Sequence, residues 1–289
     1  MVPSFAISIC VLSLAQAALV AAPAPGPFPW LERLRGPAWA VIPAASIVVF
    51  VIVLRLAAGA AEGITYLALG AVPLLAIVTF AVAARGARPL LALAVVPLFA
   101  LAWLDRTALA GQSAALALSA LSCVTLGALL AGVAPARWLK VGIVVMAMID
   151  TALVVSDLLQ APNDVLNAAA PAAGLPRLQD ETWGDAVMGY GDLFIAAALG
   201  ALLAADRARQ RRGAYLAAAL ALAFNLLFFW VRELPATVPV AATLLVLELG
   251  GRLGVRRAAH PRSASVLPHA RGPSPPLRAS AEEDLGRRV

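Results

Sequence analysis

The sequence predicts an all-α protein that crosses a membrane many times, and three observations predict it. First, 62% of the 289 residues are hydrophobic and 13% are charged, with a mean hydropathy of +0.89. A soluble domain of this length could not bury so much apolar surface. Second, the apolar residues gather in nine segments. Third, lysine and arginine are abundant in every second loop and scarce in the others.

Each apolar segment is near the length that a helix needs to cross a bilayer, about 20 residues. Backbone groups in lipid must form hydrogen bonds within their own segment, so apolar segments of this length form helices. In chain order they lie at about 4–22, 38–58, 63–84, 88–104, 112–134, 138–159, 185–205, 212–231 and 235–251. The first segment could instead be a signal peptide, but no basic residue precedes it, which favours a retained span.

The positive charges set the orientation, because loops rich in lysine and arginine remain in the cytoplasm. With nine spans, loops after odd-numbered spans share a side with the C-terminal tail, and that side carries 18 of the 22 basic residues. The other side carries only Arg55, Arg106, Arg177 and Arg232. We therefore expect the N-terminus outside and the C-terminus inside, in a multi-pass protein of a bacterial plasma membrane.

The net charge of +6 comes from the cytoplasmic loops and tail. It indicates topology and contact with the lipid bilayer, and no nucleic-acid partner is expected. Residues 252–289 are rich in Arg, Pro, Ser and Ala, which predicts a disordered basic cytoplasmic tail. Cys10 and Cys123 lie inside apolar segments, so neither a disulfide nor a metal site is expected.

Two aspartates interrupt consecutive apolar segments. Asp150 lies in the middle of the sixth, and Asp192 follows Gly189-Tyr190-Gly191 near the start of the seventh. A carboxylate in a span costs roughly 2.5 kcal/mol or more, so a functional role is the first hypothesis. With a rise of about 1.5 Å per residue and a core of about 30 Å, both aspartates lie about 10–12 Å below the outer face. Neighbouring antiparallel helices can therefore bring the two carboxylates together.

Such a pair has a recognised chemistry. Two close carboxyls in a low dielectric share one proton. The ionised group can act as a general base on water while the protonated group polarises a carbonyl, so an amide can be hydrolysed without a metal or a cofactor. Gly189 and Gly191 lack side chains and allow a backbone or a substrate to approach closely. Two alternatives remain: each aspartate is structural, or Asp157, seven residues after Asp150, is the partner of Asp192.

The ordered set of motifs resembles the presenilin and signal peptide peptidase family of intramembrane aspartyl proteases. That family has nine spans, a catalytic aspartate in the sixth, a Gly-x-Gly-Asp motif in the seventh and a Pro-Ala-Leu motif opening the ninth. Here Asp150 matches the first position, Gly189 to Asp192 match the second, and Pro235-Ala236-Thr237 falls where the third belongs. Ile149 stands in place of the usual tyrosine, and Thr237 replaces leucine.

The resemblance covers about 138–250 and implies a presenilin-like arrangement of the helices. It implies that residues 1–137 form an N-terminal five-helix half and 138–251 a catalytic four-helix half. The outside N-terminus is similar to signal peptide peptidase, which implies cleavage of transmembrane helices or signal-peptide remnants without an obligatory partner subunit. The implied residues are Asp150 and Asp192 for catalysis, and Gly189, Tyr190, Gly191, Pro235, Ala236 and Thr237 for the motifs around the substrate.

Two other functions fit part of the pattern. Type IV prepilin peptidases also carry Gly-x-Gly-Asp, but Phe194 stands where they have lysine, and the polar segment 160–184 cannot supply the extra span between their aspartates. A transporter or an inactive homologue could line a path with Asp150, Asp192, Asn225 and Glu248. No inverted repeat in the sequence supports a transporter.

Overall fold

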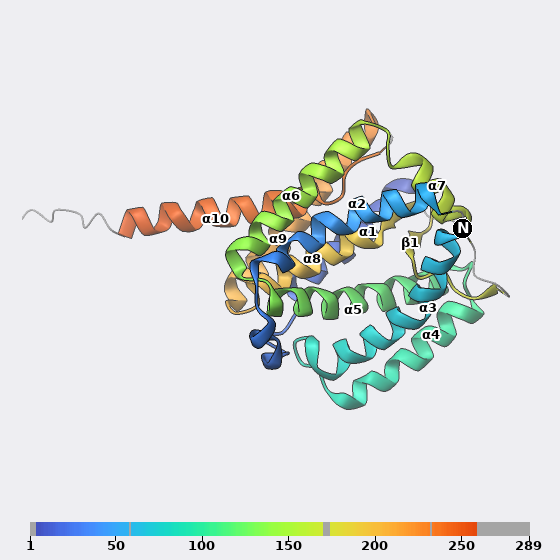
Figure 1. Cartoon of the computed structure of the whole chain (residues 1–289), viewed down its shortest axis with the longest axis horizontal. Helices are drawn as coiled ribbons and strands as arrows, with labels where there is room; N and C mark the ends of the chain where they lie inside the picture. The colour runs from blue at the N-terminus through green and yellow to red at the C-terminus, as the bar shows by residue number, and fades with distance from the viewer. Residues whose placement is uncertain (1–3, 58, 170–173, 232, 259–289) are drawn as a thin grey trace, which may run out of the picture. The chain divides into compact units, whose positions relative to one another are not determined.

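The computed structural model describes residues 4–57, 59–169, 174–231 and 233–258, and Figure 1 traces the chain. Residues up to Gly250 form one compact unit. Most of its length is in α-helices: α1 (Phe5–Ala21), α2 (Ile42–Leu56), α3 (Ala60–Val78), α4 (Val95–Leu104), α5 (Leu109–Val133), α6 (Ala136–Val155), α7 (Gln160–Ala168), α8 (Tyr190–Leu203), α9 (Arg207–Asn225) and α10 (Val238–Ala258). Tighter or wider helical turns extend several of them: η1 (Pro29–Leu34), η2 (Pro37–Val41), η3 (Thr79–Ala83), η4 (Pro89–Ala94) and η6 (Leu226–Phe229).

Each apolar segment predicted from the sequence contains a helix, so the helical class is confirmed. Five helical stretches of the described residues are long and apolar enough to cross a membrane: Pro37–Leu56, Ala60–Ala83, Leu109–Val133, Ala136–Val155 and Arg207–Phe229. Four apolar helices are shorter: Phe5–Ala21, Pro89–Leu104, Tyr190–Leu203 and Val238–Gly250. The tail beyond Ala258, which the sequence predicts to be disordered, lies outside the described residues.

Local sequence explains several helix boundaries. Pro37 and Pro89 open η2 and η4, where the missing amide hydrogen of proline costs nothing. Asp206 caps α9, because its side chain accepts a hydrogen bond from the Arg209 amide at 3.0 Å. Helix α6 ends at Val155, and two residues later Asp157 adopts φ +56°, which no α-helix can continue.

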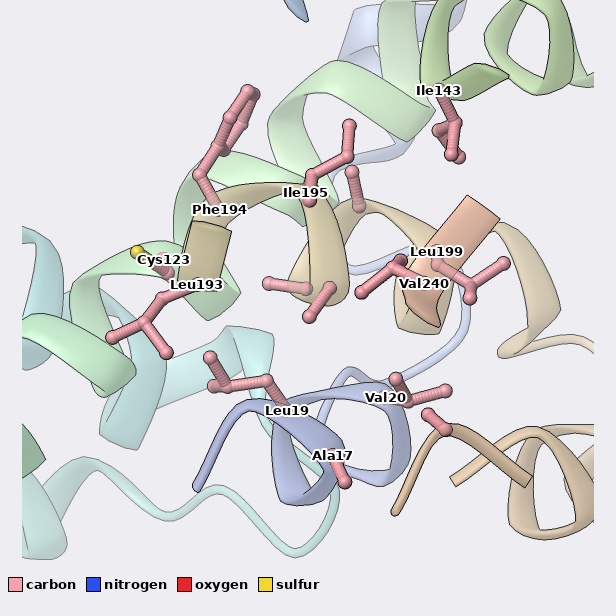
Figure 2. Packing of buried hydrophobic residues seen from close by; sticks show 14 of the residues in the cluster. Ala17, Leu19, Val20, Cys123, Ile143, Leu193, Phe194, Ile195, Leu199 and Val240 are labelled. Carbon is pink, nitrogen blue, oxygen red and sulfur yellow. The ribbon is translucent and has the colours of Figure 1, made fainter. Parts of the chain in front are cut away.

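Helix α8 is buried without interruption from Leu193 to Gly200. It packs against α1 and α5 (Figure 1). Figure 2 shows Leu19 and Val20 of α1 gathered with side chains of α8 around one apolar cluster. Lipid tails are as apolar as leucine, so within a bilayer such contacts are stabilised by close packing rather than by exclusion of water.

Two glycines allow the backbones around α8 to approach. A Cβ added to Gly127 of α5 would lie 2.6 Å from the Ala197 carbonyl carbon. A Cβ added to Gly200 of α8 would lie 2.6 Å from the carbonyl oxygens of Leu19 and Val20. Both obstacles are backbone atoms, which cannot rotate aside as side chains do. Glycine is therefore required on both sides of α8.

The polar segment 160–184, which the sequence indicates does not span, contains regular structure in its described residues. It contains α7 and β1 (Asp180–Trp183), which pairs in antiparallel fashion with β2 (Ala186–Gly189). Gly184 makes the turn between them with φ +59°, a conformation that glycine adopts without strain. Gly189 ends β2 and is also the N-cap of α8. The hairpin therefore fixes the point at which the chain enters α8.

Replacing Gly200 with leucine should destabilise the protein, because the new side chain would meet the backbone of α1. Overpacking of this kind costs about 1–3 kcal/mol or more. The measurement is the melting temperature in detergent. The matched control is Gly70→Leu on α3, an exposed position where an added Cβ meets nothing within 4 Å. Equal melting temperatures for the two variants would contradict the close packing of α8.

Candidate active site

A cavity of about 1130 Å³ opens beside the first turn of α8. Its walls are mainly apolar and come from helices that are distant in sequence, among them α1, α3, α5 and α6. Asp150 and Asp192 both line it, as do Gly189, Tyr190, Gly191 and Ala236. The cavity thus contains most of the motif residues predicted from the sequence.

Asp150 lies on α6 and is only 6% exposed. Its Oδ2 accepts a hydrogen bond from the Thr237 hydroxyl at 2.6 Å. Thr237 is itself buried and stands just before α10. The residue that departs from the Pro-Ala-Leu pattern is therefore the one that contacts the candidate carboxylate.

Asp192 lies in the first turn of α8 and is half-buried. Its Oδ2 accepts a hydrogen bond from the Gly189 amide at 3.2 Å, so the carboxylate closes the N-terminus of its own helix. The positive end of the helix dipole favours a negative charge at this position. Local backbone geometry, rather than a distant partner, orients this side chain.

The two carboxylates lie close enough for their charges to interact. Helices α6 and α8 pack together, and Gly191 lies beside Met146, since an added Cβ would make an ordinary contact with the Met146 methyl carbon at 3.5 Å. Met146 lies one helical turn before Asp150. The contact between the two helices is therefore next to the two acids.

Gln16 of α1 connects the two motifs, which the sequence reasoning missed. The residue is 2% exposed, and its side-chain amide donates to the Asp192 carbonyl oxygen at 3.1 Å and to the Ala236 carbonyl oxygen at 2.9 Å. Pro235, next to Ala236, is also buried. A glutamine in the middle of an apolar segment was the available signal, since a polar side chain there needs partners.

Tyr190 is anchored to α5. Its hydroxyl lies 2.6 Å from the Ser122 hydroxyl, and its carbonyl oxygen accepts a weak hydrogen bond from the Cys123 thiol at 3.8 Å. The side chain lines the cavity and is fixed at its far end. Tyr190 therefore attaches the Gly-Tyr-Gly-Asp turn to α5.

Two other acids that the sequence raised lie away from the cavity lining. Asp157 is exposed, in the turn after α6, so it does not take the place of Asp150. Glu248 forms ion pairs with Lys140 at 2.9 Å and with Arg209. These two cations compensate the negative charge of Glu248, which therefore takes no part in the candidate pair.

Glu181 of β1 is a buried acid outside the candidate pair, and the sequence did not indicate its burial. It is 1% exposed, and its Oε1 has no hydrogen-bond partner among the described residues. Burial raises the pKa of this carboxyl well above its ordinary range, and the neighbouring Asp180 raises it further. The hairpin packs on α5 and on α1, and these contacts bury the side chain.

No protein-family model, curated protein or solved structure matches this chain. Among the described residues, no three His, Cys, Asp or Glu side chains are grouped so that they could hold a metal ion. The cavity offers two interacting carboxyls, one bonded to a hydroxyl and one to a backbone amide. Carboxyls so placed can exchange protons with a water molecule and with a substrate carbonyl.

Thr237→Val should lower stability by about 1–3 kcal/mol, because it leaves the buried Asp150 carboxyl without its hydroxyl donor. Thr237→Ser keeps the donor and should remain near wild type. Thermal unfolding in detergent measures both. Equal losses in the valine and serine variants would show that this hydrogen bond does not stabilise the fold.

Glu181→Gln should stabilise the protein, and the gain should grow with pH. The unfolded chain releases the proton near pH 4.3, whereas the raised pKa keeps it on the folded protein. The cost of Glu181 is therefore absent at pH values below about 4.3 and increases as the pH rises toward the folded pKa. Melting temperatures of both proteins at pH 5 and pH 8 test this. If the increase in melting temperature from Glu181→Gln were no larger at pH 8 than at pH 5, the raised pKa of the buried Glu181 carboxyl would be contradicted.

Proposed function

We propose that this protein is an intramembrane aspartyl protease that hydrolyses peptide bonds within transmembrane helices or signal-peptide remnants. One observation carries the proposal: Asp150 and Asp192, from two different helices, line one cavity with interacting carboxylates. The presence of Ala236 and Thr237 at the same place gives support, since the resemblance to presenilin and signal peptide peptidase predicts that grouping.

The chemistry needs only the pair and a water molecule. The ionised carboxyl removes a proton as the water oxygen attacks the peptide carbonyl carbon, and the protonated carboxyl gives its proton to the carbonyl oxygen. This step forms a gem-diol and exchanges the two protonation states. The newly protonated carboxyl then protonates the amide nitrogen, and the other accepts a proton from the gem-diol. The C–N bond breaks to give an acid and an amine, and the pair again shares one proton.

Short helix α8 is compatible with access of water to this site. Its 14 residues span about 21 Å, less than the hydrocarbon core of about 30 Å. The bilayer thins around a short helix, or flanking polar groups reach toward the interface. Asp192 in its first turn then lies near water although the rest of α8 is buried.

We extend the proposal to nine spans in a bacterial plasma membrane, with the N-terminus outside and the C-terminus in the cytoplasm. The four shorter apolar helices support this count, because together with the five long stretches they give nine apolar helical stretches among the described residues. The charge asymmetry of the loops supports the orientation. Gln16 supports retention of the first span, since it bonds to two motif carbonyls.

The alternatives receive less support from the contacts. A transport path would use Asn225 and Glu248: Asn225 lines the cavity and donates to the Ser13 hydroxyl at 2.9 Å, but Glu248 is not part of the lining and is held by Lys140 and Arg209. For a prepilin peptidase, Phe194 takes the place of the expected lysine and is buried against the core.

Asp150→Asn and Asp192→Asn should each lower cleavage of a model membrane helix by about 100-fold or more, because asparagine cannot act as an acid or a base. The assay follows product formation in proteoliposomes. Asp157→Asn is the matched control: this exposed acid lies seven residues after Asp150 and should retain activity. Retained cleavage by either variant of the pair would remove that residue from the mechanism.

The same preparations test insertion and orientation. In a background lacking Cys10 and Cys123, Ala161→Cys places one thiol on the exposed face of α7. An impermeant reagent should label it from outside in wild type and in both asparagine variants. Labelling from the cytoplasmic side alone would overturn the orientation, and loss of labelling in one variant would attribute its inactivity to failed insertion.

A further inference from the structure

Three more carboxylates line the cavity besides the candidate pair. They are Asp164 of α7, Asp180 of β1 and Glu233, which lies between η6 and α10, and they are called the acidic rim below. All three belong to connecting segments rather than to the long apolar helices. No Lys, Arg or His is among the described residues of the cavity wall, so its formal charge is entirely negative.

Asp180 is the most deeply buried acid of the rim. It is 6% exposed, and its Oδ2 accepts a hydrogen bond from the Thr182 hydroxyl at 3.3 Å. Its Oδ1 is buried and has no partner among the described residues. Burial raises the pKa of Asp180, although the exposed Arg177, which does not line the cavity, attracts the carboxylate and opposes the shift. Asp180 therefore adds to the cavity wall a carboxylate whose Oδ1 has no hydrogen-bond donor among the described residues.

The carboxylate of Glu233 is repelled by neighbouring carboxylates. Gln160, a neutral partner, donates a hydrogen bond to the Oε1 of Glu233, and no ion pair to Glu233 is formed within the described part of the chain. Burial raises the pKa of Glu233, and the carboxylates of Asp157 and Asp164 raise it further. A cation placed among these groups would relieve this repulsion.

We propose that the acidic rim binds the side chain of a lysine or arginine that flanks the cleaved segment of the substrate. This inference rests on the proposed protease function and names the substrate class that the site prefers. The described acids do not gather into a metal-binding group, which favours an ammonium or guanidinium over a chelated ion. Lipid phosphate would be repelled by the same charges.

The position of the rim also sets where the basic residue must lie. From Asp150 to the end of α6 at Val155 is about 8 Å along the helix axis. An extended substrate advances about 3.3 Å per residue, so the cation should lie a few residues from the scissile bond, on the side of the hairpin and α7. The proposed orientation makes this the outer flank, where positive residues are scarce in membrane helices. The rim would thus select a minority of spans.

The first test changes only the substrate. Model helices identical except for Lys, Gln or Glu at one outer-flank position, placed in turn two to six residues from the cut, are cleaved by the wild-type protein in proteoliposomes. The lysine helix should have a kcat/KM about tenfold above the glutamine helix, mainly through KM, since a charge-assisted hydrogen bond is worth that much. The glutamate helix should be the poorest, and high salt should reduce the difference.

The second test changes the rim. Asp164→Asn combined with Glu233→Gln should remove most of the lysine preference, measured as the ratio of kcat/KM for the lysine helix to that for the glutamine helix. Asp164→Lys combined with Glu233→Lys should reverse the preference toward the glutamate helix. Asp185→Asn is the control, an exposed acid in the hairpin turn that does not line the cavity, and it should keep the wild-type preference.

Failure of the inference and failure of the proposed function give different results. Equal kcat/KM for the three helices at every flank position, with cleavage that still requires Asp150 and Asp192, would overturn the acidic rim and leave the protease. Cleavage of none of the helices by the inserted wild-type protein would overturn the protease, and the rim proposal with it. A lysine preference that survives in the double neutral variant would also contradict the rim.

Discussion

The burial of α8 is the constraint on which the rest of the structure depends. Its backbone is in contact distance of α1 at Gly200 and of α5 at Gly127, with no room for a single added carbon on either side. Those contacts fix the axis and the rotation of the helix. Because Asp192 lies in its first turn, the position of one candidate acid is decided by packing several turns away from it.

Side-chain hydrogen bonds between helices further restrict the arrangement that close packing allows. Within a bilayer, side-chain hydrogen bonds between helices are specific even when each contributes little free energy. Gln16, Thr237 and Ser122 come from three separate helical regions, and each bonds to a motif residue or its backbone. The apolar helices provide the enclosure, and these few groups select one arrangement inside it.

Much of this could be predicted from sequence, and the remainder could not, for a physical reason. The apolar segments are determined by local composition, so their helices were found, and the cost of a carboxylate in lipid drew attention to Asp150 and Asp192. The hairpin, the burial of Glu181 and the role of Gln16 depend on contacts between residues far apart in the chain. In the sequence, Thr237 is only a departure from the Pro-Ala-Leu motif, and its hydrogen bond to Asp150 is visible in the structure alone.

The bonds made by Gln16 have a consequence for synthesis. Its second acceptor, the Ala236 carbonyl, is made 220 residues later. At about 5–20 residues per second, translation leaves α1 in the membrane for roughly 10–40 s before that partner exists. The first acceptor, the Asp192 carbonyl, is made 176 residues after Gln16, and Asn225, the partner of Ser13, is made 212 residues after Ser13, so these polar groups of α1 lack their final partners for most of this interval. Early protection of α1, by the insertion machinery or by neighbouring helices, is thus a requirement for assembling the site.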